Sequence, residues 1–141
     1  MLSMLATIQP GSVWKPWVDH ITNHKHDYGL QKACLVEHNG IVSAASKGFH
    51  PTAKEIQAVN RIFLEKLNNN IISDRLSLSG RTYMIKSLSS TQIVAFSGSK
   101  YIIVSRSKTK HIIALCDSKS KYTEAADWLG KLCQKLIQKG F

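Results

Sequence analysis

Several polar side chains have the residue types that catalysis or metal binding uses, but none has the partners that such chemistry requires. His24 and His26 lie two positions apart in a polar stretch, and two imidazoles alone lack the further ligands of a closed zinc site. Asp19-His20 provides two members of a catalytic triad, yet neither a nucleophile elbow nor a glycine-rich oxyanion loop accompanies it. GxGxxG and Walker A motifs are also absent. We therefore predict a protein that binds other molecules, has no metal or other cofactor, and is not an enzyme.

The three cysteines are expected to be reduced and buried. Cys34, Cys116 and Cys133 are odd in number, lack CxxC spacing and lie in apolar stretches. Residues 1 to 10 contain no basic segment of the kind that opens a signal peptide. No window approaches 18 apolar residues, so no membrane span is predicted. These features together favour a soluble protein of the cytoplasm.

The composition is that of a single folded domain with a strong positive charge. The 141 residues are 43% hydrophobic and 20% charged, which is ordinary for a globular domain and unlike a disordered chain. Lysine and arginine number 19 against 9 acidic residues, giving a net charge of +10. This charge favours an acidic partner, whether protein, phospholipid headgroup or nucleic acid.

The first half of the chain predicts a helix, a hairpin and a second helix after an N-terminal extension over residues 1–11. Helical spacing of apolar residues begins at Ser12, which could cap the helix, and Pro16 is tolerated if it lies in the first turn. Residues 33–37 and 41–45 read as strands joined by a type I′ turn at Asn39-Gly40, and a polar loop precedes them. An amphipathic helix follows over residues 53–67.

The second half predicts five short strands and a closing helix. The strands cover residues 76–80, 82–86, 92–96, 101–105 and 111–116, and their short connections favour an antiparallel meander. The last helix runs from residue 123 to residue 137. Residues 12–141 therefore read as one α/β domain of the α+β type, in which the terminal helices cover an apolar face of the sheet.

Four segments in a fixed order resemble the profilin family of actin-monomer-binding proteins. Residues 14–19 read WxxWVD, similar to the family's opening, and residues 33–46 resemble its first hairpin. Residues 80–85 read GRTYMI, similar to a strand of many members, and residues 128–141 resemble the closing helix with its terminal aromatic residue. The resemblance implies a central antiparallel sheet with the N- and C-terminal helices packed on one face and a further helix on the other.

The resemblance also implies a site for proline-rich ligands on the two terminal helices. Trp14, Trp17 and Phe141 are its expected aromatic walls, because a polyproline II helix binds by laying its rings against flat aromatic faces. The family usually has tryptophan at the position of Ser43 and, in animal members, often histidine at the position of Lys135. Losing a central aromatic side chain weakens a binding site, so we expect weak binding of proline-rich ligands.

A second surface implied by the resemblance binds actin through the later strands and the start of the last helix. An acidic partner would suit its mixed apolar and basic character, with charge mainly raising the association rate. The matching positions are Ser73, Arg75, Arg81, Ile85, Lys100, Ile102, Lys121, Tyr122, Asp127 and Lys131.

Two functions other than actin binding stay open at this point. Phosphoinositide binding would be an addition to actin binding and not an alternative to it. A nucleic-acid-binding module would use Tyr83 and Tyr101 as exposed aromatics beside Arg81, Arg106 and Lys108. A roadblock or longin-like scaffold shares the order of helices and strands, but it does not require the three aromatic walls to converge. Lysine and arginine clusters would bind anionic phosphoinositides as a form of regulation.

Overall fold

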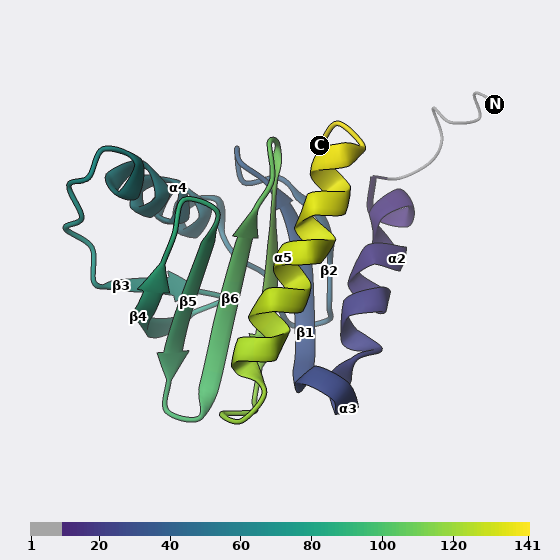
Figure 1. Cartoon of the computed structure of the whole chain (residues 1–141). Coiled ribbons are helices and arrows are strands. Elements are labelled where there is room, and N and C mark those ends of the chain that lie inside the picture. The colour runs from purple at the N-terminus through teal and green to yellow at the C-terminus, as the bar shows by residue number, and fades with distance from the viewer. Residues whose placement is uncertain (1–9) are drawn as a thin grey trace.

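A seven-stranded antiparallel sheet forms the centre of the computed structural model, which describes residues 10–141 (Figure 1). The strands are β1 (Leu30–Glu37), β2 (Val42–Ala45), β3 (Arg75–Leu78), β4 (Arg81–Leu88), β5 (Gln92–Ser97), β6 (Lys100–Arg106) and β7 (Lys110–Cys116). Their order across the sheet is β2-β1-β7-β6-β5-β4-β3. The predicted meander is confirmed, since β3 to β7 pair consecutively and β1 then pairs with β7.

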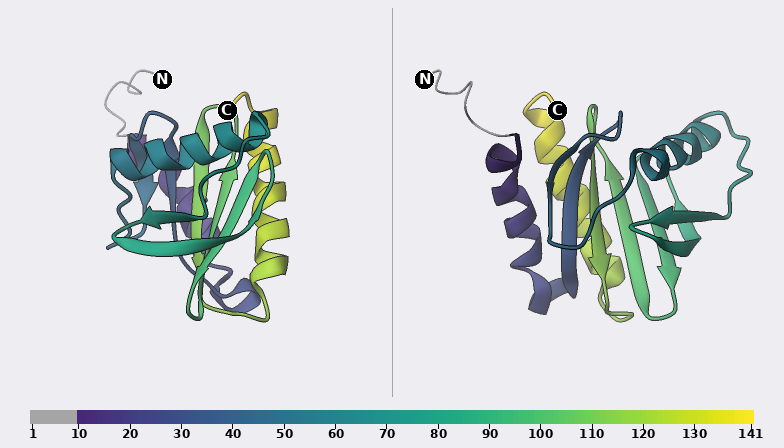
Figure 2. Two further views of the ribbon diagram at one scale, coloured as in Figure 1. Left: turned by 90° about the vertical axis from the view of Figure 1, so that its left-hand side faces the viewer. Right: turned by 180° about the vertical axis from the view of Figure 1, so that it is seen from behind.

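Helices cover both faces of this sheet. They are α2 (Pro10–Thr22), α3 (Lys25–Tyr28), α4 (Ala53–Leu67) and α5 (Tyr122–Gln138). Figures 1 and 2 show α2 and α5 next to one another on one face and α4 on the opposite face. The fold class predicted from the sequence is thus confirmed, including the pairing of the terminal helices on one side.

Alternation along the strands divides the core into two clusters. On β6, Tyr101 and Ile103 face α2 and α5, whereas Ile102 and Val104 face α4. Successive side chains of a strand point to opposite faces, so a central strand buried on both faces must be apolar throughout. We call the two sides of the sheet the α5 side and the α4 side.

The N-terminal helix begins earlier than predicted. Residues 1–9 lie outside the described residues, but Pro10 and Gly11, expected in the extension, belong to α2. Pro16 therefore lies in the second turn of α2 and not in the first. In the second turn, its missing N–H group removes a helical hydrogen bond. The polar loop expected after α2 contains the short helix α3.

The turn at Asn39-Gly40 is not the predicted type I′ turn. The N–H of Gly40 donates to the carbonyl of Glu37, so His38 and Asn39 are the central residues of the turn. Only Gly40, with φ of 97°, lies in the left-handed region, whereas a type I′ turn needs two such residues. The Asn39 side chain accepts a hydrogen bond from the Ile41 N–H. Asn39 therefore stabilises the turn through its side chain and does not adopt the left-handed backbone conformation.

Helix α4 has the predicted bounds because a capping box defines its start. The Thr52 hydroxyl accepts from the Glu55 N–H, and Glu55 Oε1 accepts from the Thr52 N–H. The Glu55 carboxylate also accepts from the N–H groups of Ser79 and Gly80 in the β3–β4 turn. One side chain therefore joins the helix start to the hairpin at the edge of the sheet.

Replacing Glu55 with alanine is expected to lower the free energy of unfolding by about 1–2 kcal/mol, because three backbone N–H groups lose their acceptor. Urea unfolding would measure the change. Gln57→Ala, an exposed position of the same helix, serves as the control with an expected effect under about 0.5 kcal/mol. Equal effects of the two substitutions would contradict the anchoring role.

The three cysteines are buried and free, as predicted. Burial raises the pKa of Cys133 to about 11, so its thiol stays protonated at neutral pH. Within residues 10–141, no helix is both long and apolar enough to cross a bilayer.

Candidate functional site

The three aromatic side chains expected to bind proline-rich ligands converge at one end of the α2–α5 pair. The rings of Trp14 and Phe141 meet edge to face with centroids 4.9 Å apart, and the rings of Trp14 and Trp17 lie 6.1 Å apart. All three are partly exposed. The distances are those of favourable aromatic pairs, so the predicted grouping is present.

Phe141 reaches Trp14 because the turn between β6 and β7 holds its backbone. The main-chain oxygen of Phe141 accepts hydrogen bonds from the Ser107 hydroxyl at 2.8 Å and from the Thr109 hydroxyl at 3.0 Å. The Thr109 N–H is a third donor to the same oxygen. This turn therefore positions an aromatic wall.

A buried lysine lies beside Ser43, the position at which the family usually has tryptophan. Lys110 Nζ is 4.4 Å from the centroid of the Trp14 ring and donates to the Ser43 hydroxyl at 2.9 Å. The Glu37 carboxylate is 3.8 Å from the ammonium. Burial lowers the pKa of Lys110, and Glu37 partly opposes that shift. Nothing in the sequence marks this lysine as special, because only the sheet register brings it to Ser43 and Trp14.

A groove between α2 and α5 continues from these aromatic walls. Pro16, Trp17 and His20 of α2 and Leu132 and Lys135 of α5 line its volume of about 250 Å³. Trp17 lines this open groove, whereas Trp14 contacts Lys110 and Phe141.

The ten residues expected to contact actin do not share one face. Arg75 alternates on β3 with the buried Leu76 of the α4-side cluster, so its side chain belongs to the α5 side. Tyr122, whose ring stacks on Tyr101 at 4.0 Å, and Asp127 also lie there. Two more of the ten residues lie near or on α5: Lys121 is half-buried and Lys131 is exposed.

The other members of that set lie on the α4 side or in the connection that leads to β3. Ile85 packs against the α4-side cluster, and Arg81 pairs with Leu78 of the same cluster. Lys100 alternates with Tyr101 and therefore also faces the α4 side. Two further members are Ser73, which is hydrogen-bonded to Glu65, and Ile102.

Ile102 is a correction to the predicted contact set. Its side chain is 0% exposed in the core beneath α4, so it has no surface to offer a partner. The continuous apolar run of β6 did not show which of its side chains would be exposed, because both faces of that strand are buried.

Residues missing from the sequence prediction complete the α5-side surface. Met84 is 52% exposed and lies opposite Phe96 on the neighbouring strand. Lys86 Nζ is 5.8 Å from the Phe96 ring and 5.9 Å from the Tyr122 ring. Arg75, Met84, Lys86 and Phe96 form what we call the strand surface, and Tyr122 lies beside it at the start of α5. The alternation of β4 was a usable signal, but the sequence did not show which face α4 covers.

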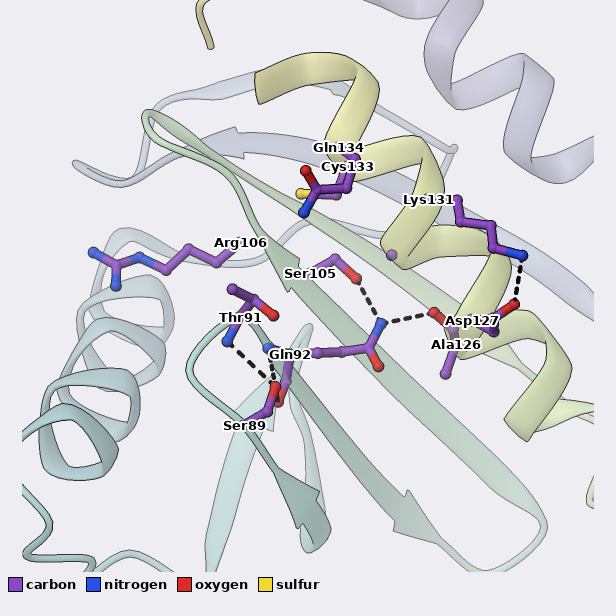
Figure 3. Close-up of a pocket in the computed structure, with 11 residues that line it drawn as sticks. Ser89, Thr91, Gln92, Ser105, Arg106, Ala126, Asp127, Lys131, Cys133 and Gln134 are labelled. Carbon is purple, nitrogen blue, oxygen red and sulfur yellow. Dashed lines mark hydrogen bonds and ion pairs between the residues drawn. The ribbon is translucent and has the colours of Figure 1, made fainter. Parts of the chain in front are cut away.

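A polar pocket beside α5 fixes this helix against the sheet (Figure 3). Gln92 Nε2 donates to the Ser105 hydroxyl at 2.9 Å and to the Ala126 carbonyl at 2.8 Å. Asp127 and Lys131 form an exposed ion pair at 3.1 Å on the rim. The Gln92 side chain therefore holds α5 against the sheet at this pocket, which has a volume of about 290 Å³.

The exposed aromatic platform expected of a nucleic-acid-binding module is not formed. Tyr83 is 3% exposed and Tyr101 is 5% exposed, and they belong to clusters on opposite faces of the sheet. Bases cannot stack on buried rings. Within residues 10–141, no group of three or more His, Cys, Asp or Glu side chains is placed to hold a metal ion.

Comparisons with known proteins agree with this architecture. Residues 12–141 match the sequence profile of the family described as Profilin. Acanthamoeba castellanii profilin IB is similar in structure, with a TM-score of 0.77 and 23% identity over 91% of this chain and 99% of that one. Schizosaccharomyces pombe profilin has a TM-score of 0.77 and 22% identity over 91% of this chain and 99% of its own.

A third similar structure contains an actin. LokiProfilin1, solved in a complex with rabbit actin, has a TM-score of 0.69 and 14% identity, covering 85% of this chain and 90% of that one. A search of curated sequences found no significant match.

Proposed function

The chain belongs to the profilin family, and on that premise we propose that it binds actin monomers and so regulates actin polymerisation without covalent chemistry. Supporting this proposal is the strand surface beside the start of α5, where Met84, Phe96 and Tyr122 lie next to basic side chains. Exposed apolar groups with a basic rim suit an acidic globular partner. A profilin of similar fold has been solved with rabbit actin. This function would place the protein in the cytoplasm, with the actin cytoskeleton.

The direct test is assembly of pyrene-labelled actin in the presence of the purified protein. A protein that occupies one end of the monomer is expected to slow spontaneous assembly in proportion to its concentration. Unchanged assembly curves at saturating protein would contradict the proposal.

Proline-rich segments are the proposed ligands of the second surface, and their binding is expected to be weak. Trp14, Trp17 and Phe141 converge, but Ser43 replaces an aromatic wall and Lys110 lies against Trp14. Losing one central aromatic residue costs about 2 kcal/mol at a binding hot spot.

Octaproline is accordingly expected to change the tryptophan fluorescence of the protein only at high peptide concentration. The Trp17→Ala variant should lose most of the remaining response, because Trp17 lines the open groove. A tight complex with the unmodified protein would show that Ser43 is compensated.

Anionic phosphoinositides are a proposed regulatory ligand, supported by the net charge of +10. Of the two alternative functions, nucleic-acid binding loses support because its expected aromatic residues are buried. A roadblock or longin-like scaffold is disfavoured because the terminal aromatic residues meet.

A further inference from the structure

A second aromatic cluster lies between the terminal helices, away from Trp14 and Phe141. The Trp128 ring of α5 is 4.5 Å from the His24 ring and 5.4 Å from the His20 ring, by centroids. Tyr28 stacks on the same indole at 5.4 Å with an interplanar angle of 25°. We call these four residues the lower aromatic cluster. It joins the start of α5 to the end of α2 and to α3.

The groove between α2 and α5 connects this cluster to the first aromatic group. His20 belongs to the lower aromatic cluster and also lines the groove together with Trp17. Trp17 in turn contacts Trp14, whose ring meets Phe141. Aromatic rings therefore follow one another between α2 and α5 from Phe141 to the lower aromatic cluster. We call this row of rings, together with the groove, the seam.

The seam is long enough for an extended peptide of moderate length. The eight helical steps from Trp14 to the end of α2 at Thr22 rise about 12 Å. A polyproline II segment covers that distance with about four residues. A ligand of ten residues would thus contact both aromatic groups.

The lysine that lines the groove lacks an acidic partner. Lys135 lines the groove and makes no ion pair with any carboxylate of the described residues. The acidic residues on this part of α2 and α3 are already engaged, since Asp19 pairs with Lys15 and Asp27 pairs with His24. An incoming carboxylate would therefore find an unpaired ammonium at the groove.

We propose that the seam binds a proline-rich protein segment that reaches the lower aromatic cluster and carries an acidic residue opposite Lys135. The inference rests on the proline-rich part of the proposed function and names the class of ligand. Proline rings stack on the aromatic side chains, and the free backbone carbonyls of a polyproline II segment accept hydrogen bonds. The carboxylate supplies selectivity through charge complementarity with Lys135.

The three tryptophans of the chain report separately on the two ends of the seam. Trp14 and Trp17 belong to the aromatic group that includes Phe141, whereas Trp128 belongs to the lower aromatic cluster. Their indole N–H signals in a ¹H–¹⁵N NMR spectrum therefore map the bound ligand. Each signal is assigned from a tryptophan-to-phenylalanine variant. A ten-residue proline peptide with a central glutamate is expected to shift all three signals. Shifts confined to Trp14 and Trp17, or no shift at all, would overturn the proposal.

Charge selectivity is tested by comparing that peptide with versions that have central proline or central lysine. At low ionic strength the glutamate peptide should bind about three-fold tighter than the proline peptide, and the lysine peptide more weakly than both. Lys135→Glu is expected to reverse this order. Lys54→Glu, an exposed lysine of α4 on the other side of the sheet, is the matched control and should preserve it. Equal affinities of the three peptides for the unmodified protein would overturn the proposal.

These measurements contain no actin, so their outcome is independent of the assembly assay. A protein that slows actin assembly but binds no acidic proline peptide would retain its proposed action on actin and lose this inference. A protein that binds the peptide without affecting actin assembly would retain this inference and lose its proposed action on actin.

Discussion

Acidifying the protein from pH 7.5 to pH 4.5 is expected to lower its free energy of unfolding by about 2–3 kcal/mol, because a buried histidine must stay neutral. His111 is 0% exposed. Burial, followed by the nearby His38 and Arg106, lowers its pKa to about 3. The folded protein thus binds fewer protons than the unfolded chain between pH 3 and 6.5, and its stability falls as the pH falls through that range.

The hydrogen bonds of His111 explain why a proton is so unfavourable there. Its Nε2 donates to Asn60 Oδ1 at 2.7 Å when the ring is neutral. Protonation would add hydrogen to Nδ1, a buried atom with no hydrogen-bond partner. The charged ring would then lie close to Arg106 in a dry part of the core.

Urea unfolding at several pH values would measure this dependence. His111→Gln keeps a donor for Asn60 but cannot titrate, so most of the slope below pH 6.5 should disappear even if stability at pH 7.5 also falls. His50→Gln, at an exposed histidine, should leave the slope unchanged. An unaltered slope in the His111 variant would show that another group is responsible.

Replacing Arg75 and Lys86 together with glutamate is expected to weaken actin binding at least ten-fold, which is about 1.4 kcal/mol. Both side chains belong to the strand surface, and Lys86 lies near the rings of Phe96 and Tyr122. Two reversed charges facing an acidic partner would slow association, most strongly at low ionic strength. Titration of pyrene-actin assembly with each variant gives the comparison.

The matched control reverses two charges that the sequence assigned to the same surface. Arg81 and Lys100 face the α4 side, so Arg81→Glu combined with Lys100→Glu changes the net charge equally while leaving the strand surface intact. This variant should retain near-normal inhibition of assembly. If it were the weaker of the two, the proposed surface would be on the wrong face of the sheet.

Much of the fold followed from local patterns that act over a few residues. Thr52 and Glu55 define the start of α4 through bonds that span three positions, so its bounds could be predicted from the sequence. The bounds of α2 were less predictable, because proline is best tolerated in the first turn of a helix and α2 accommodates Pro16 in its second turn. The Asn39-Gly40 turn was located correctly, but its type was not, because Gly40 has a positive φ and Asn39 does not.

The candidate site could be predicted only in part. Trp14, Trp17 and Phe141 were found because aromatic residues at the two ends of the chain stand out in a sequence that resembles a known family. Lys110 and Trp128 could not be found in the same way, since each looks like an ordinary residue of its own element. Their partners, Ser43 and His24, are 67 and 104 positions away, respectively.

The amino-acid sequence by itself determined the order of the strands and of the longer helices, the antiparallel meander and the reduced, buried state of the cysteines. These depend on periodicity, capping and turn residues, which are local properties of the chain. Only the tertiary structure decided which face of each strand is covered and which side chains meet across the sheet. It placed Lys86 with Tyr122 and buried Ile102 beneath α4, because the packing of a helix on one face settles which of two alternating sets of side chains remains exposed.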